Sequence, residues 1–175
     1  MRLLKGIVVG VVLTIVVIAI GGLVALRTGM VPANADARPN GLEEWAARAS
    51  LRATMHREAP NVNNPLPLND ANVLAGVKLY AQNCALCHGD SSGNPSNVAK
   101  GLYQHAPQFA HHGVEDDADG YTYWKVTHGI RWTGMPSFGG SLSDTQIWQV
   151  ALFLKHMDSL SPTAQRAWSQ VSVDK

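Results

Sequence analysis

"AQNCALCHGDSSG", residues 81–93, contains both cysteines of this 175-residue chain. Cys84 and Cys87 are separated by two residues, and His88 follows the second cysteine directly. Two thiols and an imidazole at this spacing suit a redox dithiol, a zinc site, a short disulfide or a covalently attached metal macrocycle. The residues around this stretch decide among these chemistries.

Three of the alternatives lack support in the rest of the chain. A thioredoxin-type dithiol lies at a helix start in an alternating strand and helix pattern, whereas no long run here alternates apolar and polar residues. A structural zinc site needs four ligands, so a distant histidine would have to join Cys84, Cys87 and His88. A disulfide between these two cysteines closes a very small loop and stabilises little. Cys-x-x-Cys-His is the attachment motif of c-type haem, in which both thiols form thioethers and the histidine binds the iron.

A second iron ligand would strengthen this interpretation. Haem iron with histidine on one face and methionine on the other is six-coordinate and suited to electron transfer. Among five methionines, Met135 lies in the glycine-rich stretch "HGIRWTGMPSFGG", residues 128–140. Pro136 restrains Met135 to an extended backbone, which can present its sulfur to the iron. His88 and Met135 are the expected axial ligands. Two histidines remain as rival sixth ligands, His112 and His128.

With these motifs identified, residues 70–160 resemble a class I c-type cytochrome. The resemblance rests on "CALCH", on "TGMPSF", and on Gly76 and Tyr80, which precede Cys84 at the spacing found in the family. In that family a small residue and an aromatic residue at these places let the first and last helices cross closely, because glycine has no side chain. The residues expected to face this crossing are Ile147, Trp148, Ala151 and Leu154. The resemblance implies an all-α fold, with a small helical domain around one covalently bound haem c.

The resemblance also implies which residues surround the haem. A proline carbonyl would accept a hydrogen bond from His88 and so orient its imidazole. Pro107, in "HAPQFA", is the expected acceptor, although its flanking residues depart from the common pattern of the family. Arg131 and Trp132, just before the methionine, are candidates to donate hydrogen bonds to the haem propionates.

The beginning of the chain predicts a membrane anchor. Residues 6–26 contain no charged residue, and a bilayer-spanning helix needs roughly 20 apolar residues. A secretory signal peptide is the alternative, but its apolar core is usually shorter, about 7 to 15 residues. Arg2 and Lys5 favour a cytoplasmic N-terminus, whereas Arg27 weakens that bias. We expect an uncleaved anchor at residues 1–27 in a bacterial inner membrane, with the haem domain in the periplasm.

Residues 28–69 are expected to form a linker or arm that is rich in proline and asparagine. Within it Asn40 is placed to cap a short helix near residues 41–59. That helix carries a narrow apolar stripe that could pack on the domain, on lipid headgroups or on a partner. The stripe consists of Leu42, Trp45, Ala46 and Ala49.

The remaining helices are predicted from their end signals. Three are expected inside the cytochrome segment, at residues 70–85, 120–128 and 143–157. Asp70 and Asp119 are placed to cap the first two, and Ser143 with Gln146 forms a capping box for the third. A tail at residues 161–175 is expected to hold a short helix that begins with Pro162.

The expected function is one-electron transfer in a bacterial respiratory or related chain, between redox partner proteins that the sequence does not name. A formal net charge of +1 gives no basic field for nucleic acid. One alternative is a haem subunit fixed in a larger membrane oxidase or dehydrogenase complex. A haem enzyme such as a peroxidase is less favoured, because it needs an open iron face. No enzymatic activity is expected of the chain itself.

Overall fold

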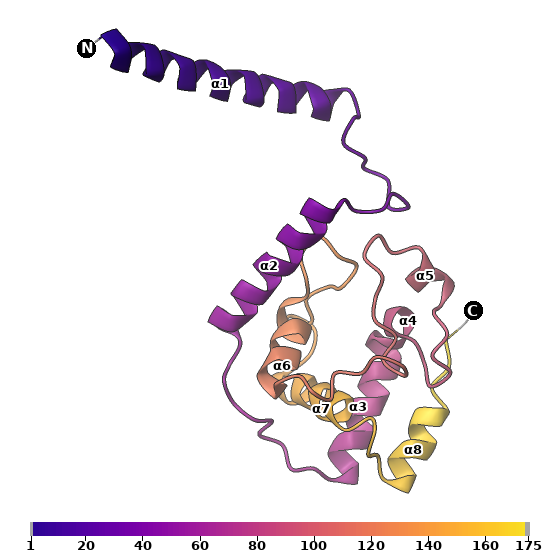
Figure 1. Cartoon of the computed structure of the whole chain (residues 1–175). Coiled ribbons are helices and arrows are strands. Elements are labelled where there is room, and N and C mark those ends of the chain that lie inside the picture. Colours follow the sequence, from indigo (N-terminus) through magenta and orange to yellow (C-terminus); the bar gives the residue numbers. More distant parts are fainter. Residues whose placement is uncertain (1, 174–175) are drawn as a thin grey trace. The chain divides into compact units, whose positions relative to one another are not determined.

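The computed structural model describes residues 2–173, and the regular structure within that range consists of α-helices only. The all-α fold class is therefore confirmed for this part of the chain. The chain divides into two compact units, residues 1–37 and residues 38–175 (Figure 1). The second unit includes the arm and the tail that flank the expected segment 70–160.

Helix α1 (Arg2–Arg27) makes up most of the first unit. None of its residues is buried, and its most apolar window has a mean hydropathy of 3.0. Its 26 residues exceed the roughly 20 that cross the hydrocarbon core of a bilayer. By length and composition α1 is able to span a membrane, a property that signal sequences near an N-terminus share.

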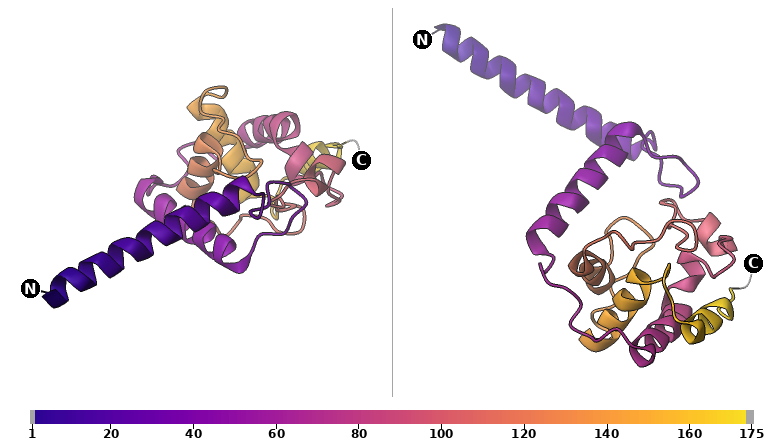
Figure 2. Two further views of the ribbon diagram at one scale, coloured as in Figure 1. Left: turned by 90° about the horizontal axis from the view of Figure 1, so that it is seen from above. Right: turned by 60° about the horizontal axis from the view of Figure 1, so that its bottom comes forward.

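The second unit is built on the crossing of α3 (Asp70–Asn83) and α7 (Asp144–Lys155), which all three ribbon views show packed together (Figures 1 and 2). The close approach expected at Gly76 is present, because a Cβ there would lie 2.2 Å from the carbonyl oxygen of Gln149 and 2.8 Å from Cβ of Phe153. Ile147, Trp148, Ala151 and Leu154, which were expected to face the crossing, are all buried. The atoms nearest to a Cβ at Gly76 belong to Gln149 and Phe153.

Helix α7 buries most of its surface. Seven of its residues are buried, so the helix is apolar on nearly every side. Trp148, for example, stacks on Tyr123 of α6 (Asp119–His128) with ring centroids 4.2 Å apart. A helix that buries most of its surface has no single apolar face from which its contact with α3 can be read.

Tyr80 is the centre of the core. It is fully buried and meets the rings of Phe153 at 5.5 Å and Trp168 at 5.4 Å, both edge-on. Its hydroxyl donates a hydrogen bond to the carbonyl of Gly89 at 2.7 Å, which satisfies the one polar atom of a buried ring. Trp168 belongs to α8 (Pro162–Ser169), the helix predicted in the tail, so the tail completes the core.

The last described residue, Val173, is also hydrogen-bonded to the rest of the second unit. The backbone N–H of Val173 donates to the buried carboxylate of Asp90 at 3.1 Å. Another oxygen of that carboxylate accepts hydrogen bonds from the backbone and hydroxyl of Ser92. The Asp90 carboxylate therefore ties the loop after the Cys-x-x-Cys-His motif to the tail.

Several helix ends form as predicted. Asn40 caps α2 (Gly41–Glu58) by accepting a hydrogen bond from the backbone of Glu43 at 2.9 Å. Ser143 and Gln146 form the reciprocal capping box at the start of α7. Pro162 occupies the first turn of α8. These predictions succeed because caps depend on residues that are neighbours in sequence.

The predicted caps of α3 and α6 are wrong by one residue. Asn69 has the extended backbone of a cap and accepts a hydrogen bond from the first turn of α3, while Asp70 is already helical. Asp119 is the first residue of α6 and follows Ala118, whose side chain offers no cap. Its carboxylate instead accepts a hydrogen bond from the backbone of Asn64 in the arm, at 2.8 Å. That tertiary contact is not visible in the local sequence.

The arm is packed onto the second unit. Met55 of α2 is buried, and a Cβ on Gly120 of α6 would lie 1.8 Å from the carbonyl oxygen of Pro60. The apolar stripe predicted on α2 faces outward, since Leu42 is 73% exposed and Trp45 is 67% exposed. The stripe therefore does not pack on the described part of the domain, which was one of the three surfaces considered for it.

Candidate functional site

The Cys-x-x-Cys-His motif forms a single helical turn. After α3 ends at Asn83, the chain continues as α4 (Ala85–His88), and the backbone N–H of His88 donates to the carbonyl of Cys84 at 2.9 Å. Residues three apart on a helical turn lie on the same side, so Cys84 and Cys87 project together. Both are free thiols that are partly buried.

The environment of Cys84 does not suit redox or zinc chemistry. Burial raises the pKa of its thiol to about 12, with a smaller contribution from Cys87. Redox-active cysteines instead have lowered pKa values. Among residues 2–173, no group of three or more His, Cys, Asp or Glu side chains could hold a metal ion, so the zinc alternative finds no third and fourth ligand there.

The His88 ring is fixed by two residues of the loop between α5 (Asn97–Lys100) and α6. Its Nδ1 lies 3.0 Å from the carbonyl oxygen of Pro107. Because a carbonyl only accepts, Nδ1 carries the proton and Nε2 keeps its lone pair. The ring stacks on Phe109, with centroids 4.4 Å apart and an angle of 3°. The Pro107 carbonyl thus accepts the hydrogen bond from Nδ1 of His88.

Burial also favours the neutral form of this imidazole. Desolvation lowers the pKa of His88 below its ordinary value of 6.5, and the hydrogen bond to Pro107 opposes this only in part. Among the described residues Nε2 has no hydrogen-bond partner. A neutral, oriented ring with one free nitrogen is the form of histidine that binds a metal.

The loop that bears Met135 is closed by hydrogen bonds to itself and to α6. Ile130 donates its backbone N–H to the carbonyl of Met135 at 3.2 Å, and Met135 donates its own to the hydroxyl of Thr133 at 3.1 Å. Gly129 begins the loop with φ +66°, and a Cβ there would lie 2.6 Å from the carbonyl carbon of Pro136. Glycine is required at this position by both the backbone conformation and the space. The Met135 side chain is partly buried and packs on the core.

Comparison with known families agrees with this geometry. The family model described as "Cytochrome C oxidase, cbb3-type, subunit III" matches residues 71–154. Residues 71–154 form a class I c-type cytochrome domain. The match spans the Cys-x-x-Cys-His turn, the Pro107 loop and the Met135 loop, but it excludes α2 and α8.

One solved structure similar to this chain belongs to the reducing HAO-like protein complex of Kuenenia stuttgartiensis. The two are 27% identical with a TM-score of 0.44, over 54% of this chain and 48% of that chain. The match therefore covers about half of the length of that protein. No curated protein matches the sequence.

A cytochrome c domain implies a haem cofactor and haem-based electron transfer. The donor set of this domain fits such a group. It offers a histidine nitrogen with no other partner, a thioether from a constrained loop, and two adjacent free thiols, which are the groups that a c-type haem uses. The chemistry of the residues present and the family of the domain therefore agree.

A cavity of about 910 Å³ adjoins these motifs. Its wall includes residues 129–133, which lead to Met135, and residues 103 and 104, which lead to Pro107. Cys84, Cys87 and His88 are not among its lining residues. The cavity thus borders the segment that leads to Met135 and the segment that leads to Pro107.

One buried polar atom on this wall makes no hydrogen bond. Trp124 of α6 is 8% exposed, and its Nε1 has no hydrogen bond of ordinary geometry among the described residues. The pKa of the nearby Glu58 carboxyl is lowered chiefly by its hydrogen bond to Arg57, and the indole N–H is the smallest contributor. An acceptor bound in the cavity would satisfy this buried donor, which otherwise has only the Glu58 carboxylate beside it.

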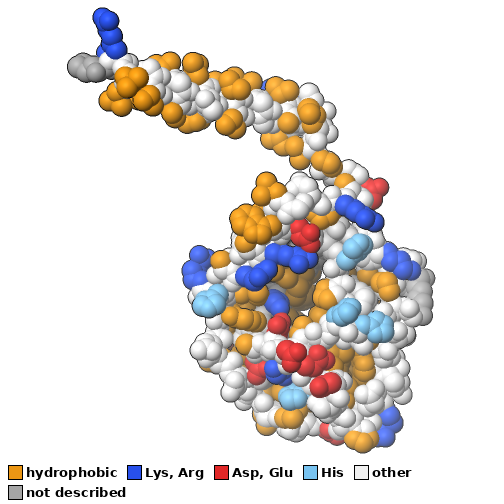
Figure 3. Space-filling view, viewed as in Figure 1, with side chains coloured by type: hydrophobic (Ala, Val, Ile, Leu, Met, Phe, Trp, Pro, Cys, Tyr) orange, Lys and Arg blue, Asp and Glu red, His pale blue; other side chains and the backbone are white. Residues whose placement is uncertain are grey.

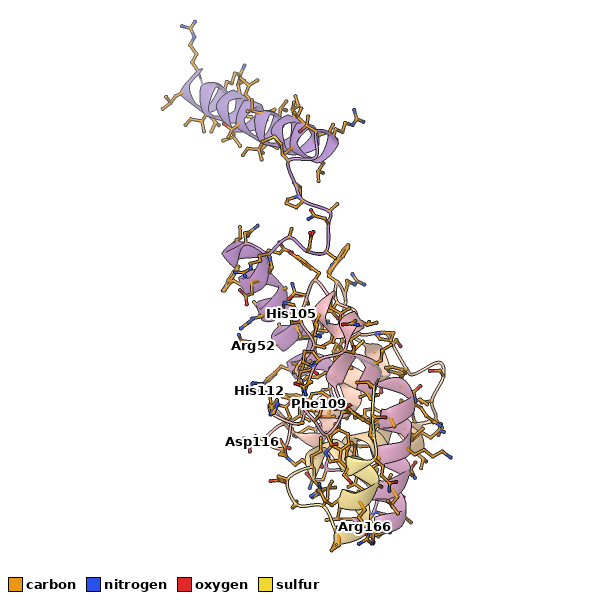
Figure 4. All side chains as sticks on the ribbon, turned by 90° about the vertical axis from the view of Figure 1, so that its right-hand side faces the viewer. Arg52, His105, Phe109, His112, Asp116 and Arg166 are labelled. Atoms are coloured by element: carbon orange, nitrogen blue, oxygen red, sulfur yellow. The ribbon has the colours of Figure 1, made fainter. Side chains whose placement is uncertain are left out.

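Three of the other predicted residues line the same cavity. Arg131 and Trp132 both line it, yet Trp132 is 87% exposed and neither residue has a hydrogen bond among those described. Trp132 also has φ +63°, a left-handed conformation that is rare for a bulky residue. His128 lies on the cavity wall, tilted against Trp124. His112 lies at the surface, as Figure 4 shows for this residue and for Arg52 and Asp116.

Sequence reasoning missed two residues of the site. Phe109 was not singled out, although an aromatic residue two positions after the proline that orients His88 is a signal that could have been used. Trp124 was read only as part of a predicted helix. Its position on the cavity wall depends on the way α6 packs, which its local sequence does not show.

Proposed function

We propose that this protein carries single electrons through one c-type haem, bound covalently by Cys84 and Cys87. His88 and Met135 are the axial ligands in this proposal. Haem held in this way supplies reversible one-electron chemistry, and methionine ligation raises its reduction potential relative to ligation by two nitrogens. The chain itself need not bind a substrate, and no catalytic residue is assigned.

The observation that carries this proposal is the geometry of His88. The Pro107 carbonyl 3.0 Å away and the parallel ring of Phe109 hold the imidazole with Nε2 free. A hydrogen bond from the far nitrogen of a ligating histidine fixes the ring and increases its basicity. The neighbouring thiols of Cys84 and Cys87 could then hold the same group through two thioether bonds.

We further propose that α1 is retained as an anchor in a bacterial inner membrane and that the cytochrome domain lies in the periplasm. The support is the length and hydropathy of α1, together with Arg2 and Lys5 before the apolar run. Tethering would keep the domain at high effective concentration near its redox partners. The proposed donor and acceptor are redox proteins.

A second candidate is a haem subunit fixed in a larger membrane oxidase or dehydrogenase complex. The name of the matching family refers to an oxidase subunit, and the outward stripe of α2 leaves Leu42 and Trp45 exposed. Such residues are typical of assembly surfaces. A peroxidase stays the least favoured function, because it would require that Met135 not bind the iron.

The decisive experiment is an optical spectrum of the purified protein, oxidised and reduced, with denaturing gel electrophoresis. We expect sharp low-spin bands on reduction and haem that stays with the polypeptide. Cys84→Ala and Cys87→Ala should each leave a single thioether. A protein without haem would refute the proposal. A high-spin spectrum would favour a peroxidase function over electron transfer. Co-purification of other subunits from native membranes separates the second candidate from the first.

A further inference from the structure

Helix α2, which lies outside the cytochrome domain, forms one side of the cavity beside the ligand loops. Its residues Ala47, Leu51 and Thr54 line the cavity opposite Trp124 and residues 128–133. Figure 3 shows this face of the molecule hollowed beside α2, with hydrophobic side chains at the floor of the hollow. The cavity wall is therefore divided between the arm and the cytochrome domain.

The arm is held in this position by contacts along its length. The hydroxyl of Tyr103 donates to the carboxylate of Glu43 at 2.5 Å, near the start of α2. Asn64, beyond the end of α2, donates its side-chain N–H to the carbonyl of Trp148 at 2.9 Å and its backbone N–H to Asp119. The close approach of Pro60 to Gly120 lies between these two sets of contacts. Helix α2 is thus fixed at both ends.

The cavity wall is chemically suited to carboxylates. Its lining includes three arginines, Arg48, Arg57 and Arg131, and two carboxylates, Glu43 and Glu58. Arg48 pairs with Glu44 and Arg57 with Glu58, whereas Arg131 has no ion pair among residues 2–173. The Nε1 of Trp124, which has only the Glu58 carboxylate beside it, adds a buried donor. On a haem, the propionates lie on the edge opposite the two vinyl-derived substituents that bind cysteine. A cavity whose lining lacks the cysteines and offers the guanidinium of Arg131 and an N–H donor fits that propionate edge.

We propose that α2 is the outer wall of the haem site and covers the propionate edge of the cofactor. This inference rests on the proposed function. In this proposal α2, a helix outside the cytochrome domain, limits the access of solvent to the haem. It thereby influences the reduction potential of the haem. Anionic charge on the cavity face of α2 should stabilise ferric haem, and cationic charge there should stabilise ferrous haem.

Two adjacent alanines of α2 provide a matched test. Ala47 lines the cavity, whereas Ala46 belongs to the exposed stripe and does not. The four full-length proteins Ala47→Asp, Ala47→Lys, Ala46→Asp and Ala46→Lys are titrated by spectroelectrochemistry. At the midpoint potential of the native protein, Ala47→Asp should raise the ferric to ferrous ratio about threefold or more and Ala47→Lys should lower it similarly. The two Ala46 variants should change it by less than half as much.

The outcomes are distinguishable. Equal shifts from positions 46 and 47 in proteins with intact low-spin haem would overturn the wall assignment and leave the proposed function standing. Absence of covalent haem from the native protein would remove the proposed function itself. Loss of haem from both Ala47 variants, with normal loading of both Ala46 variants, would support the wall assignment. Loss of haem from all four variants would show that the substitutions disturb the folding of α2, and it would overturn the wall assignment.

Discussion

Gly76 and Phe153 approach so closely that a Cβ on the glycine would lie 2.8 Å from Cβ of the phenylalanine. The carbonyl oxygen of Gln149 would be closer still, at 2.2 Å. Since backbone atoms cannot rotate away, any side chain at Gly76 must push α3 and α7 apart. The crossing of α3 and α7 positions the Cys-x-x-Cys-His motif that follows α3. A change at the crossing should therefore also affect the candidate haem site.

Gly76→Ala should therefore destabilise the protein by about 3 kcal/mol, the upper end of the usual cost of overpacking. The free energy of unfolding is measured in urea on the haem-loaded protein. Gly140→Ala is the control, because a Cβ at Gly140 meets nothing within 4 Å. Equal effects of the two substitutions would show that the crossing is looser than described.

Trp168→Ala tests whether the tail belongs to the core. Trp168 is 5% exposed and contacts Tyr80 and Phe153, so its removal should cost about 3–5 kcal/mol. Trp45→Ala is the matched control, with a tryptophan that is 67% exposed, and it should change stability by less than about 0.5 kcal/mol. Thermal and urea unfolding report both values. A small effect at Trp168 would mean that the cytochrome domain folds without α8.

Met135→Ala should open one face of the iron. In the reduced variant we expect rapid binding of carbon monoxide, seen as a shift of the main optical band, which the native protein resists. Met157→Ala is the control, because Met157 only packs against the core. If the variant keeps a ligand-resistant low-spin spectrum, another residue is the sixth ligand, and His128 on the cavity wall would be tested next.

Stability should fall as the pH falls below about 6.5, the ordinary pKa of histidine. Burial lowers the pKa of His88 in the folded protein. As the pH falls, the unfolded chain therefore binds a proton at a higher pH than the folded protein does, and this protonation favours unfolding. The stabilisation is complete above the unfolded pKa and is lost as the pH falls towards the folded pKa. Iron binding by Nε2 acts in the same direction.

The measurement is the free energy of unfolding at about pH 7.5 and about pH 5.5. His112→Gln, a change at the surface, serves as the control and should leave the difference between the two values nearly unchanged. A protein equally stable at both values would show that His88 does not govern its acid sensitivity.

The sequence by itself determined the parts of this protein that depend on chain neighbours. The Cys-x-x-Cys-His turn, the glycine-rich stretch around Met135, the capping box of α7 and the cap at Asn40 all follow from residues a few positions apart. Gly76 was identified as a crossing point through the spacing of the family. These signals were sufficient to predict an all-α cytochrome domain.

Tertiary structure decided which surfaces meet. Helix α7 is buried on most sides, so its pattern could not show that Gln149 and Phe153 face Gly76. Helix α2 turns its apolar stripe outward and its mixed face, with Ala47 and Leu51, to the cavity. The entry of Trp168 into the core depends likewise on contacts between distant residues. Such contacts are selected by the packing of the whole unit, and no local spacing encodes them.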